Sequence, residues 1–269
     1  MTEATANQPR VWQRYTLDQK ILRFGIYLAL VLAVVQSIRY VNIIPEFLAD
    51  APAQMVDLFN RMWPVDWAYY PQDVHSALIE TIHIATLGTI ISVILAIPVG
   101  LLAARNYTPN WFLNFIARLI LVSSRSVNSL VWALLFIAIF GPGALAGTLA
   151  IAFRSIGFVG KLVGEAIEES NEGSIEALKA TGASKGALLN YGYWPQIKPA
   201  FWSLVLLRWD INVRESAVLG LVGAGGIGMT LDTAMNLFQW ERVAVILIAI
   251  FAIVILAEIV ITQVRKRIL

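Results

Sequence analysis

The sequence is dominated by apolar stretches of about 20 residues or more, and these constrain the fold more than any other feature. A bilayer core about 30 Å thick needs roughly 20 helical residues to cross it, because an α-helix rises 1.5 Å per residue. Six stretches meet this length and are expected to be transmembrane helices: 24–44, 76–104, 112–140, 144–163, 200–221 and 243–264. The sequence therefore predicts an all-α, polytopic membrane protein with about six transmembrane helices.

Composition excludes several classes of function. Charged residues make up 14% of the chain, against about 25% in soluble domains, and the mean hydropathy is +0.69. The absence of cysteine excludes disulfides, thiol nucleophiles and thiolate metal sites, and the net charge of +2 gives no reason to expect a nucleic-acid partner. His75 and His83 flank Glu80, but they lie eight residues apart, so we expect capping and interfacial roles and no metal site.

The distribution of Lys and Arg predicts the orientation. Basic residues gather before the first apolar stretch, after the second, in the polar segment 165–199 and at the end of the chain, and positive charge favours the cytoplasmic side. We divide the chain into a cytoplasmic tail (1–23), a retained first span with a periplasmic loop (24–75), a core (76–264) and a basic cytoplasmic tail (265–269). Both termini are thus expected to be cytoplasmic.

The polar segment 165–199 reads as a helix, a turn and a second short helix. Residues 176–180 are strong helix formers, and Gly182 is suited to ending that helix. A second helical run, 184–190, is expected to end before Pro195, because proline cannot continue a hydrogen-bonded helix. The segment alone is also compatible with an ordinary cytoplasmic loop.

This segment resembles the EAA loop of ABC-importer permeases, through Glu176, Ala177, Gly182 and Pro195. It departs from that pattern at Leu178, Gly192 and Trp194, where alanine, isoleucine and leucine are usual. The sequences INVR and AVLGLVGAGGIG, at 211–214 and 217–228, extend the resemblance to the permeases of phosphonate and phosphite importers, from about residue 80 to the C-terminus.

The resemblance implies a type I ABC-importer permease (MetI-like) fold in a bacterial inner membrane, working as a homodimer among membrane lipids. Two separate ATPase subunits would hold ATP and Mg, and a periplasmic binding protein would deliver the substrate. The residues implied in coupling to the ATPase are Glu176, Ala177, Gly182 and Pro195. This chain has no G-x-x-x-x-G-K-[ST] sequence to cradle phosphates, so we expect it to be neither an ATPase nor any other enzyme, and to hold no cofactor itself.

Four glycines after the fifth apolar stretch, Gly223, Gly225, Gly226 and Gly228, formally fit a dinucleotide fingerprint. That fingerprint requires a βαβ unit, and here an apolar span comes before it, so we reject it. Two interpretations are left. The glycines could permit close helix packing, or, by the resemblance, they could form a gate at the outer end of the pore.

Among the charged residues inside the predicted spans, six are the sharpest chemical signal: Arg125, Arg154, Arg208, Asp210, Arg214 and Glu215. A charge at membrane depth must face a bundle interior or a water path. The charges could pair with one another, since Arg208 and Glu215 are seven residues apart and share a helix face. They could also line a positive translocation path for an anion, for which Arg214, Arg125 and Arg208 are the candidates.

The function expected from the resemblance is ATP-driven import of phosphonate, phosphite or a related phosphorus oxyanion. One alternative is an ABC permease for another small solute such as methionine. The other is an ion-coupled secondary transporter, which would need no ATPase.

Overall fold

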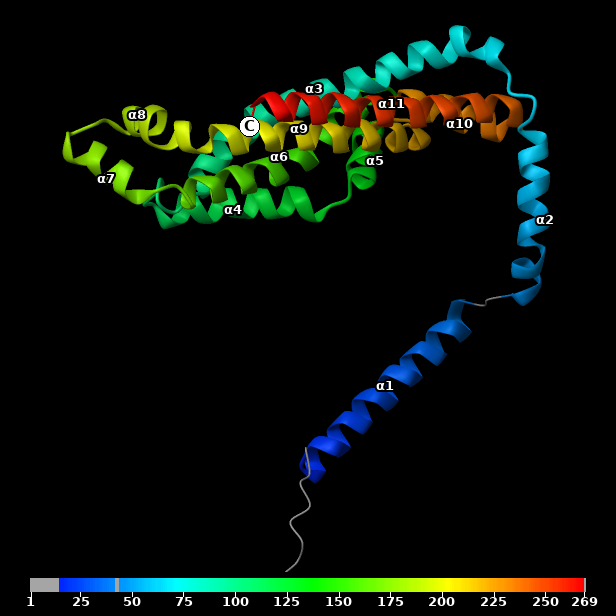
Figure 1. Ribbon diagram of the computed structural model, residues 1–269, viewed down its shortest axis with the longest axis horizontal. Helices are drawn as coiled ribbons and strands as arrows, with labels where there is room; N and C mark the ends of the chain where they lie inside the picture. Colours follow the sequence, from blue (N-terminus) through cyan, green and yellow to red (C-terminus); the bar gives the residue numbers. More distant parts are fainter. Residues whose placement is uncertain (1–14, 42–43, 269) are drawn as a thin grey trace, which may run out of the picture. The chain divides into compact units, whose positions relative to one another are not determined.

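The computed structural model describes residues 15–41 and 44–268, which form helices with no strand among them. The described residues separate into two units, one up to Asp57 and one from Leu58 onward. The helices are α1 (Leu17–Val41), α2 (Pro45–Arg61), α3 (His75–Ala103), α4 (Trp111–Ser126), α5 (Ser129–Phe140), α6 (Ala144–Glu168), α7 (Glu172–Ala180), α8 (Lys185–Ala187), α9 (Trp194–Leu219), α10 (Ile227–Asn236) and α11 (Trp240–Ile268), as Figure 1 shows.

Among the described residues, five segments are long and apolar enough to cross a membrane, or six if α4 and α5 count as one span. The stretch 112–140 is broken, because α4 and α5 meet at an angle of 92°. Asn128 causes the restart: its side chain accepts a hydrogen bond of 3.1 Å from the backbone nitrogen of Leu130 and caps α5. The polar patch in this stretch therefore ends one helix and begins another.

The N-terminal part differs from the expected span and loop. The first span begins at Leu17, whereas the sequence predicted a start at residue 24. Residues 1–14 of the predicted cytoplasmic tail lie outside the described residues. Residues 45–61 form α2, where a periplasmic loop was expected. Apolar residues such as Leu48 and Phe59 share one face of α2, and Asp50 and Asp57 lie on the opposite face. The segment expected to connect the first two spans therefore contains an amphipathic helix.

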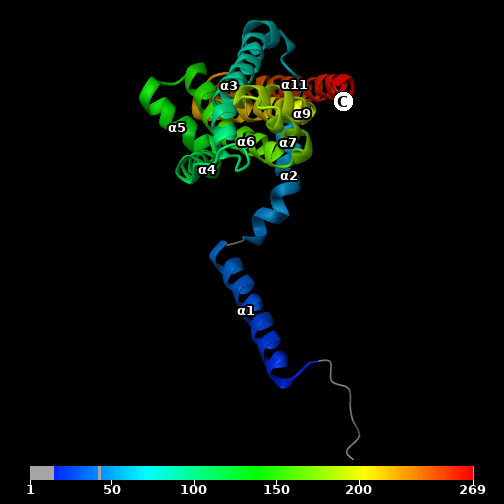
Figure 2. The same cartoon turned by 90° about the vertical axis from the view of Figure 1, so that its left-hand side faces the viewer.

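Helix α6 lies inside the second unit, against α3, α4, α5 and α9 (Figure 2). Small residues permit this burial. A Cβ on Gly100 of α3 would lie 2.8 Å from the carbonyl oxygen of Gly160 on α6, and one on Gly164 would lie 3.1 Å from the carbonyl oxygen of Gly100. Backbones that approach this closely are typical of helix pairs in membranes. The α3–α6 pair is thus the rigid centre of the bundle.

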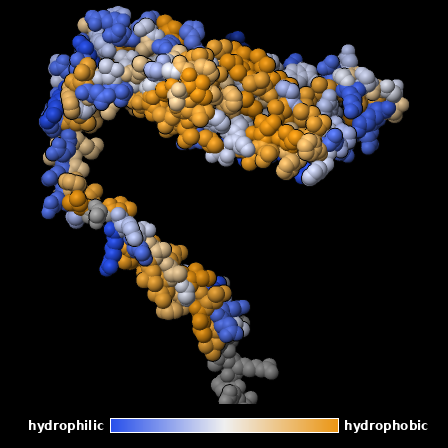
Figure 3. All heavy atoms as spheres, turned by 180° about the vertical axis from the view of Figure 1, so that it is seen from behind, coloured by the Kyte–Doolittle hydropathy of each residue, from blue (hydrophilic) through white to orange (hydrophobic). Residues whose placement is uncertain are grey.

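The outside of the bundle is apolar over its middle and polar toward its ends (Figure 3). Large hydrophobic side chains stay exposed on most of its helices, for example Ile94, Leu119, Leu134 and Phe251. A soluble protein would bury such residues, whereas lipid tails are a suitable environment for them. The fold and the sequence pattern agree that this unit is embedded in a membrane.

Candidate functional site

The segment between α6 and α9 forms two capped helices at one end of the bundle, while α10 lies at the other end (Figure 1). Asn171 caps α7 by accepting a hydrogen bond of 2.9 Å from the backbone nitrogen of Gly173. Ser184 caps α8 in the same way, accepting from the backbone nitrogen of Ala187 at 3.3 Å. Only Ile175 of α7 is buried, and it packs into a core cluster with Tyr193 and Ile197. The segment is therefore anchored by one apolar side chain.

Gly182 ends α7 as predicted. Its φ of +77° is in the left-handed region, which glycine enters without strain. The backbone nitrogen of Ala183 donates to the carbonyl of Leu178 at 3.3 Å, and that of Gly182 donates to Lys179 at 3.0 Å. This pair of hydrogen bonds is a Schellman motif. Glu176, Ala177 and Gly182 are all exposed, so the end of the bundle presents them to solvent.

Pro195 does not end a helix, contrary to the sequence-based expectation. It is the second residue of α9, a position at which the missing N–H of proline removes none of the i to i−4 hydrogen bonds within α9. The chain passes from α8 through a π-helical stretch, Leu188–Tyr193, directly into α9. The second helix of the segment is therefore continuous with a membrane-spanning helix.

Two departures from the EAA pattern lie in contact. A Cβ on Gly192 would lie 3.3 Å from a methyl carbon of Leu178 and 3.6 Å from Ile175. A larger residue at 178 is thus accommodated by a smaller one at 192. The side chain of Leu178 on α7 therefore packs against the π-helical stretch that precedes α9.

The glycine run makes a closely packed turn between α9 and α10. Gly223, Gly225 and Gly226 all have positive φ, and a Cβ on Gly226 would lie 2.6 Å from the hydroxyl of Thr81. That hydroxyl accepts a hydrogen bond of 2.8 Å from the backbone nitrogen of Ile227. A Cβ on Gly225 would lie 2.7 Å from the backbone nitrogen of Ala144, and one on Gly228 would meet the carbonyl of Ala217. The glycines hold the turn against α3 and α6.

The charges within the spans are largely paired. Glu215 of α9 accepts from Arg154 of α6 and, at 3.4 Å, from Arg208 of its own helix, as the seven-residue spacing predicted. Arg214 binds Asp210 at 2.7 Å and Glu258 of α11 at 2.6 Å. Arg208 is buried, with 4% of its side chain exposed, whereas 48% of the Arg214 side chain is exposed.

A polar seam of buried side chains connects these charges to α3. Arg208 donates to the hydroxyl of Ser155 at 2.8 Å, and Ser155 donates to the amide oxygen of Asn212 at 3.2 Å. Asn212 in turn donates to Thr89 at 2.7 Å. Ser155, Asn212 and Thr89 are not among the site residues predicted from the sequence. They could have been found as uncharged polar residues within apolar stretches, because such residues often form hydrogen bonds between neighbouring membrane helices.

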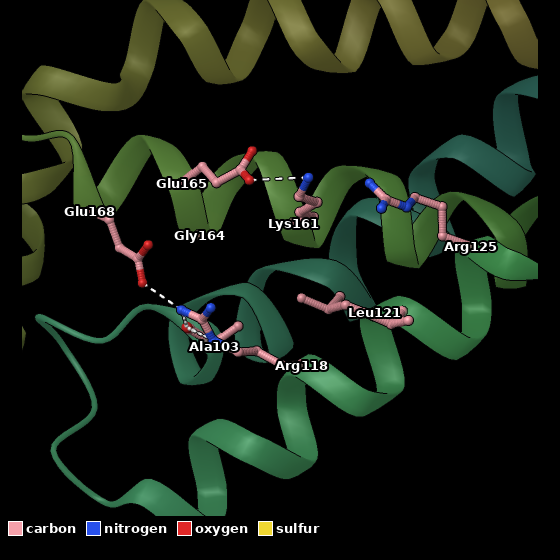
Figure 4. A pocket seen from close by; sticks show the side chains of 9 residues that line it. Ala103, Arg118, Leu121, Arg125, Lys161, Gly164, Glu165 and Glu168 are labelled. Atoms are coloured by element: carbon pink, nitrogen blue, oxygen red, sulfur yellow. Dashed lines mark hydrogen bonds and ion pairs between the residues drawn. The ribbon is translucent and has the colours of Figure 1, made fainter. Parts of the chain in front are cut away.

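A cavity of about 440 Å³ opens at the break between α4 and α5. Asn128, Ser129, Arg154, Arg214 and Glu215 are among the residues that line it. In this cavity, Arg214, a path residue predicted from the sequence, lies together with Asn128, which caps α5. The break that starts α5 was not predicted from the sequence. Arg125 is not among its lining residues. It lines a separate cavity between α4 and α6, shown in Figure 4.

The two histidines were expected to have capping and interfacial roles. His75 is the first residue of α3, and its ring lies 5.9 Å from that of Tyr70 in a tilted contact. No group of three metal-binding side chains is found within the ranges that the structure describes.

The fold has known counterparts. A chain of the MetNI methionine ABC transporter, solved in an inward-facing conformation, superposes with a TM-score of 0.63 at 19% identity, over 73% of this chain and 96% of that chain. This likeness defines the fold as that of a MetI-like ABC-transporter permease, as expected. The profile of one family, described as binding-protein-dependent transport system inner membrane component, matches residues 96–269, and the chain belongs to that family.

Two curated relatives are more similar in sequence. The phosphite transport system permease protein PtxC of Stutzerimonas stutzeri is 37% identical over 78% of this chain and 76% of its own length. The phosphate-import permease protein PhnE of Mycolicibacterium smegmatis is 36% identical over 93% of this chain. The match spans 47% of the length of that second relative, which is therefore the longer protein.

Proposed function

We propose that this chain is the translocation subunit of an ATP-driven importer for a phosphorus oxyanion, with phosphite and phosphonate as the favoured substrates. The relatives named for phosphite transport and phosphate import, at 37% and 36% identity, support this substrate class. The likeness to the methionine transporter, at 19% identity, concerns the fold alone, so methionine is the weaker alternative.

The single observation that carries the coupling proposal is the exposed α7–Gly182–α8 pair at one end of the bundle. A short helix transmits force only if it is rigid and docked, and the two caps and the Schellman turn supply the rigidity. We assign docking on a separate ATPase subunit to Glu176, Ala177 and Gly182. Pro195 fixes the start of α9, through which movement of the segment reaches the membrane.

We assign the translocation path to the side of the bundle that carries the charged residues. Arg208 and Arg214 each release a carboxylate partner and bind the anionic substrate in its place, one after the other. Arg125 neutralises the charge of the anion at a point nearer the cytoplasm. At the opposite end, the turn of Gly223, Gly225, Gly226 and Gly228 forms the gate. Because this turn is packed against α3 and α6, it moves only when those helices move.

The proposed assembly contains two copies of this chain, two ATPase subunits with their ATP and Mg, and a periplasmic binding protein. The chain sits in the bacterial inner membrane with both termini and the α7–α8 segment in the cytoplasm. This orientation places the coupling segment where ATP is available and places the glycine turn where a binding protein can reach it.

The test is ATPase activity in proteoliposomes that contain the permease, its ATPase and its binding protein. The binding protein is added empty or loaded with phosphite, phosphonate, phosphate or methionine. We expect a loaded phosphorus oxyanion to stimulate hydrolysis and drive uptake. Stimulation by methionine alone would contradict the substrate class. Uptake that follows an ion gradient, with no ATPase bound, would instead indicate a secondary transporter.

A further inference from the structure

A second cavity, of about 170 Å³, lies between α4 and α6 at the end of the bundle that carries α7. Figure 4 shows its charged residues: Arg118 and Arg125 on α4, and Lys161, Glu165 and Glu168 on α6. Leu121 and Gly164 contribute apolar surface to the same cavity. It is separate from the cavity at the α4–α5 break, with which it shares no lining residue.

Close contact between two helices positions Arg125 at this cavity. A Cβ on Gly157 of α6 would lie 2.9 Å from the backbone nitrogen of Arg125 and 3.0 Å from its Cβ. The α4 backbone is thus held against α6 one turn before Lys161. From there the guanidinium of Arg125 is directed toward Lys161, as Figure 4 shows. Two cations therefore face one cavity, on helices that cannot easily separate.

The acids at this cavity are already engaged. Arg118 binds Glu168 at 2.7 Å, and Lys161 binds Glu165 at 3.2 Å. Arg125 makes no ion pair or hydrogen bond through its guanidinium with any residue that the structure describes. The cavity therefore has one positive charge in excess, that of Arg125. Arg125 lies beside Lys161, which has one carboxylate partner.

The position of this excess charge in the helix makes it costly to leave unpaired. Gly157, against which the Arg125 backbone lies, precedes the end of α6 at Glu168 by eleven residues, roughly 16 Å along the axis of this 25-residue helix. A charged group so far from the end of a membrane-spanning helix needs a counter-charge or water. Arginine presents a planar fork of donors that matches the oxygens of a phosphate.

We infer that Arg125 and Lys161 form a binding site for a phosphate-type oxyanion between α4 and α6. The shared chemistry is a tetrahedral anion held by a guanidinium fork and an ammonium. The bound anion is either the headgroup of an anionic phospholipid or a free inorganic anion. For a free anion the inference rests on the proposed function, which places Arg125 on the translocation path, and for a lipid headgroup it goes beyond that function. In both cases binding at this site is measured without transport or ATP hydrolysis, so its failure is distinguishable from failure of the importer assignment.

The experiment compares variants of the complete transporter without its binding protein. Arg125→Gln and Lys161→Gln each remove one charge, and Arg125→Lys keeps the charge but removes the fork. Lys198→Gln is the matched control, since it removes an exposed lysine from the first turns of α9, outside the cavity. Gel filtration and melting temperature confirm that each variant assembles.

Two measurements distinguish the sources of the anion. Calorimetric titration with inorganic phosphate in a phosphate-free maltoside detergent reports a free anion. Native mass spectrometry after extraction from phosphatidylglycerol or phosphatidylcholine nanodiscs reports a bound lipid. We expect one of these signals to weaken about tenfold or more in Arg125→Gln and Lys161→Gln, corresponding to one lost charge-assisted hydrogen bond. The signal of Arg125→Lys should be intermediate between those of the two glutamine variants and that of the wild type.

Weaker phosphate binding with unchanged lipid retention assigns the site to a free anion, and the reverse result assigns it to an anionic lipid. Either result supports the inference. If neither signal in Arg125→Gln or Lys161→Gln differs from that in Lys198→Gln, the inference is wrong. If Arg125→Gln does not assemble, the comparison of Lys161→Gln with Lys198→Gln still decides.

Discussion

Asn212 of α9 donates a hydrogen bond of 2.7 Å to the hydroxyl of Thr89 on α3, and both side chains are buried. The hydroxyl of Thr89 then donates to the carbonyl of Ala85 at 2.6 Å. Together with Ser155 and Arg208, these groups form a chain in which each donor has an acceptor. The seam therefore fixes the register of α9 against both α3 and α6.

Asn212→Ala should destabilise the protein by removing both hydrogen bonds of the amide. Single hydrogen bonds between membrane helices contribute about 0.6 kcal/mol on average and up to ~1.7 kcal/mol, so we expect a loss of about 1–3 kcal/mol. Thermal unfolding in detergent measures it. Combining Asn212→Ala with Thr89→Val in a double-mutant cycle isolates the coupling. Fully additive effects of the two changes would contradict the seam.

Glu215→Gln should lower the melting temperature by several degrees, because Arg154 and Arg208 then lose their shared carboxylate. Breaking a buried pair on one side costs about 3–5 kcal/mol. Glu258→Gln is the control, since Arg214 keeps Asp210 at 2.7 Å. Equal melting temperatures for the two variants would show that Glu215 does not hold the junction.

Gly182→Ala should impair coupling through its backbone alone. A Cβ there meets no atom within 4 Å, but the φ of +77° is unfavourable for alanine by about 1–2 kcal/mol. Gly186→Ala also adds a Cβ in open space, without a positive φ. We expect fewer oxyanions transported per ATP hydrolysed in Gly182→Ala and an unchanged ratio in Gly186→Ala. An unchanged ratio in both would exclude a role for the turn.

Leu178 and Gly192 should respond to substitution as a pair. Leu178→Ala leaves a void above Gly192, and Gly192→Ile overfills the space that Leu178 occupies, so each should lower stability. The double variant exchanges the large and small residues and should recover most of the loss. Melting temperature and ATPase binding provide the readouts. A double variant that is worse than either single one would show that the two residues do not compensate.

The orientation can be tested without a background signal, because the chain contains no cysteine. Glu172→Cys in α7 and Gln239→Cys before α11 lie at opposite ends of the bundle. With a membrane-impermeant maleimide applied to intact spheroplasts, we expect labelling of Gln239→Cys only. Opening the membrane should expose Glu172→Cys. The opposite pattern would reverse the proposed topology.

The sequence was sufficient for the features that depend on local chemistry. Apolar length located the spans, and Gly182 ended α7 because helix ends favour a left-handed glycine. Pro195 was misjudged because the same residue that breaks a helix interior begins a helix well. The ion pair of Arg208 with Glu215 followed from spacing, but the pairing of Arg154 with Glu215 depends on how α6 and α9 pack.

Other features of the site depend on tertiary packing and carry no local signal. The excess charge of Arg125 appears only once Glu165 and Glu168 are seen to be engaged by Lys161 and Arg118. Likewise, the run of glycines predicted close packing or a gate, but not which helices it would contact. Thr81 and Ala144, which it meets, are far away in the sequence.

Helix α6 is packed along its glycines so closely that it has little freedom to bend. It is 25 residues long, about 37 Å, and it joins the surroundings of the glycine turn at one end to α7 at the other. A stiff rod of this length acts as a lever. A tilt of about 5° at the α7 end would displace the far end by about 3 Å, enough to separate a pair of packed backbones.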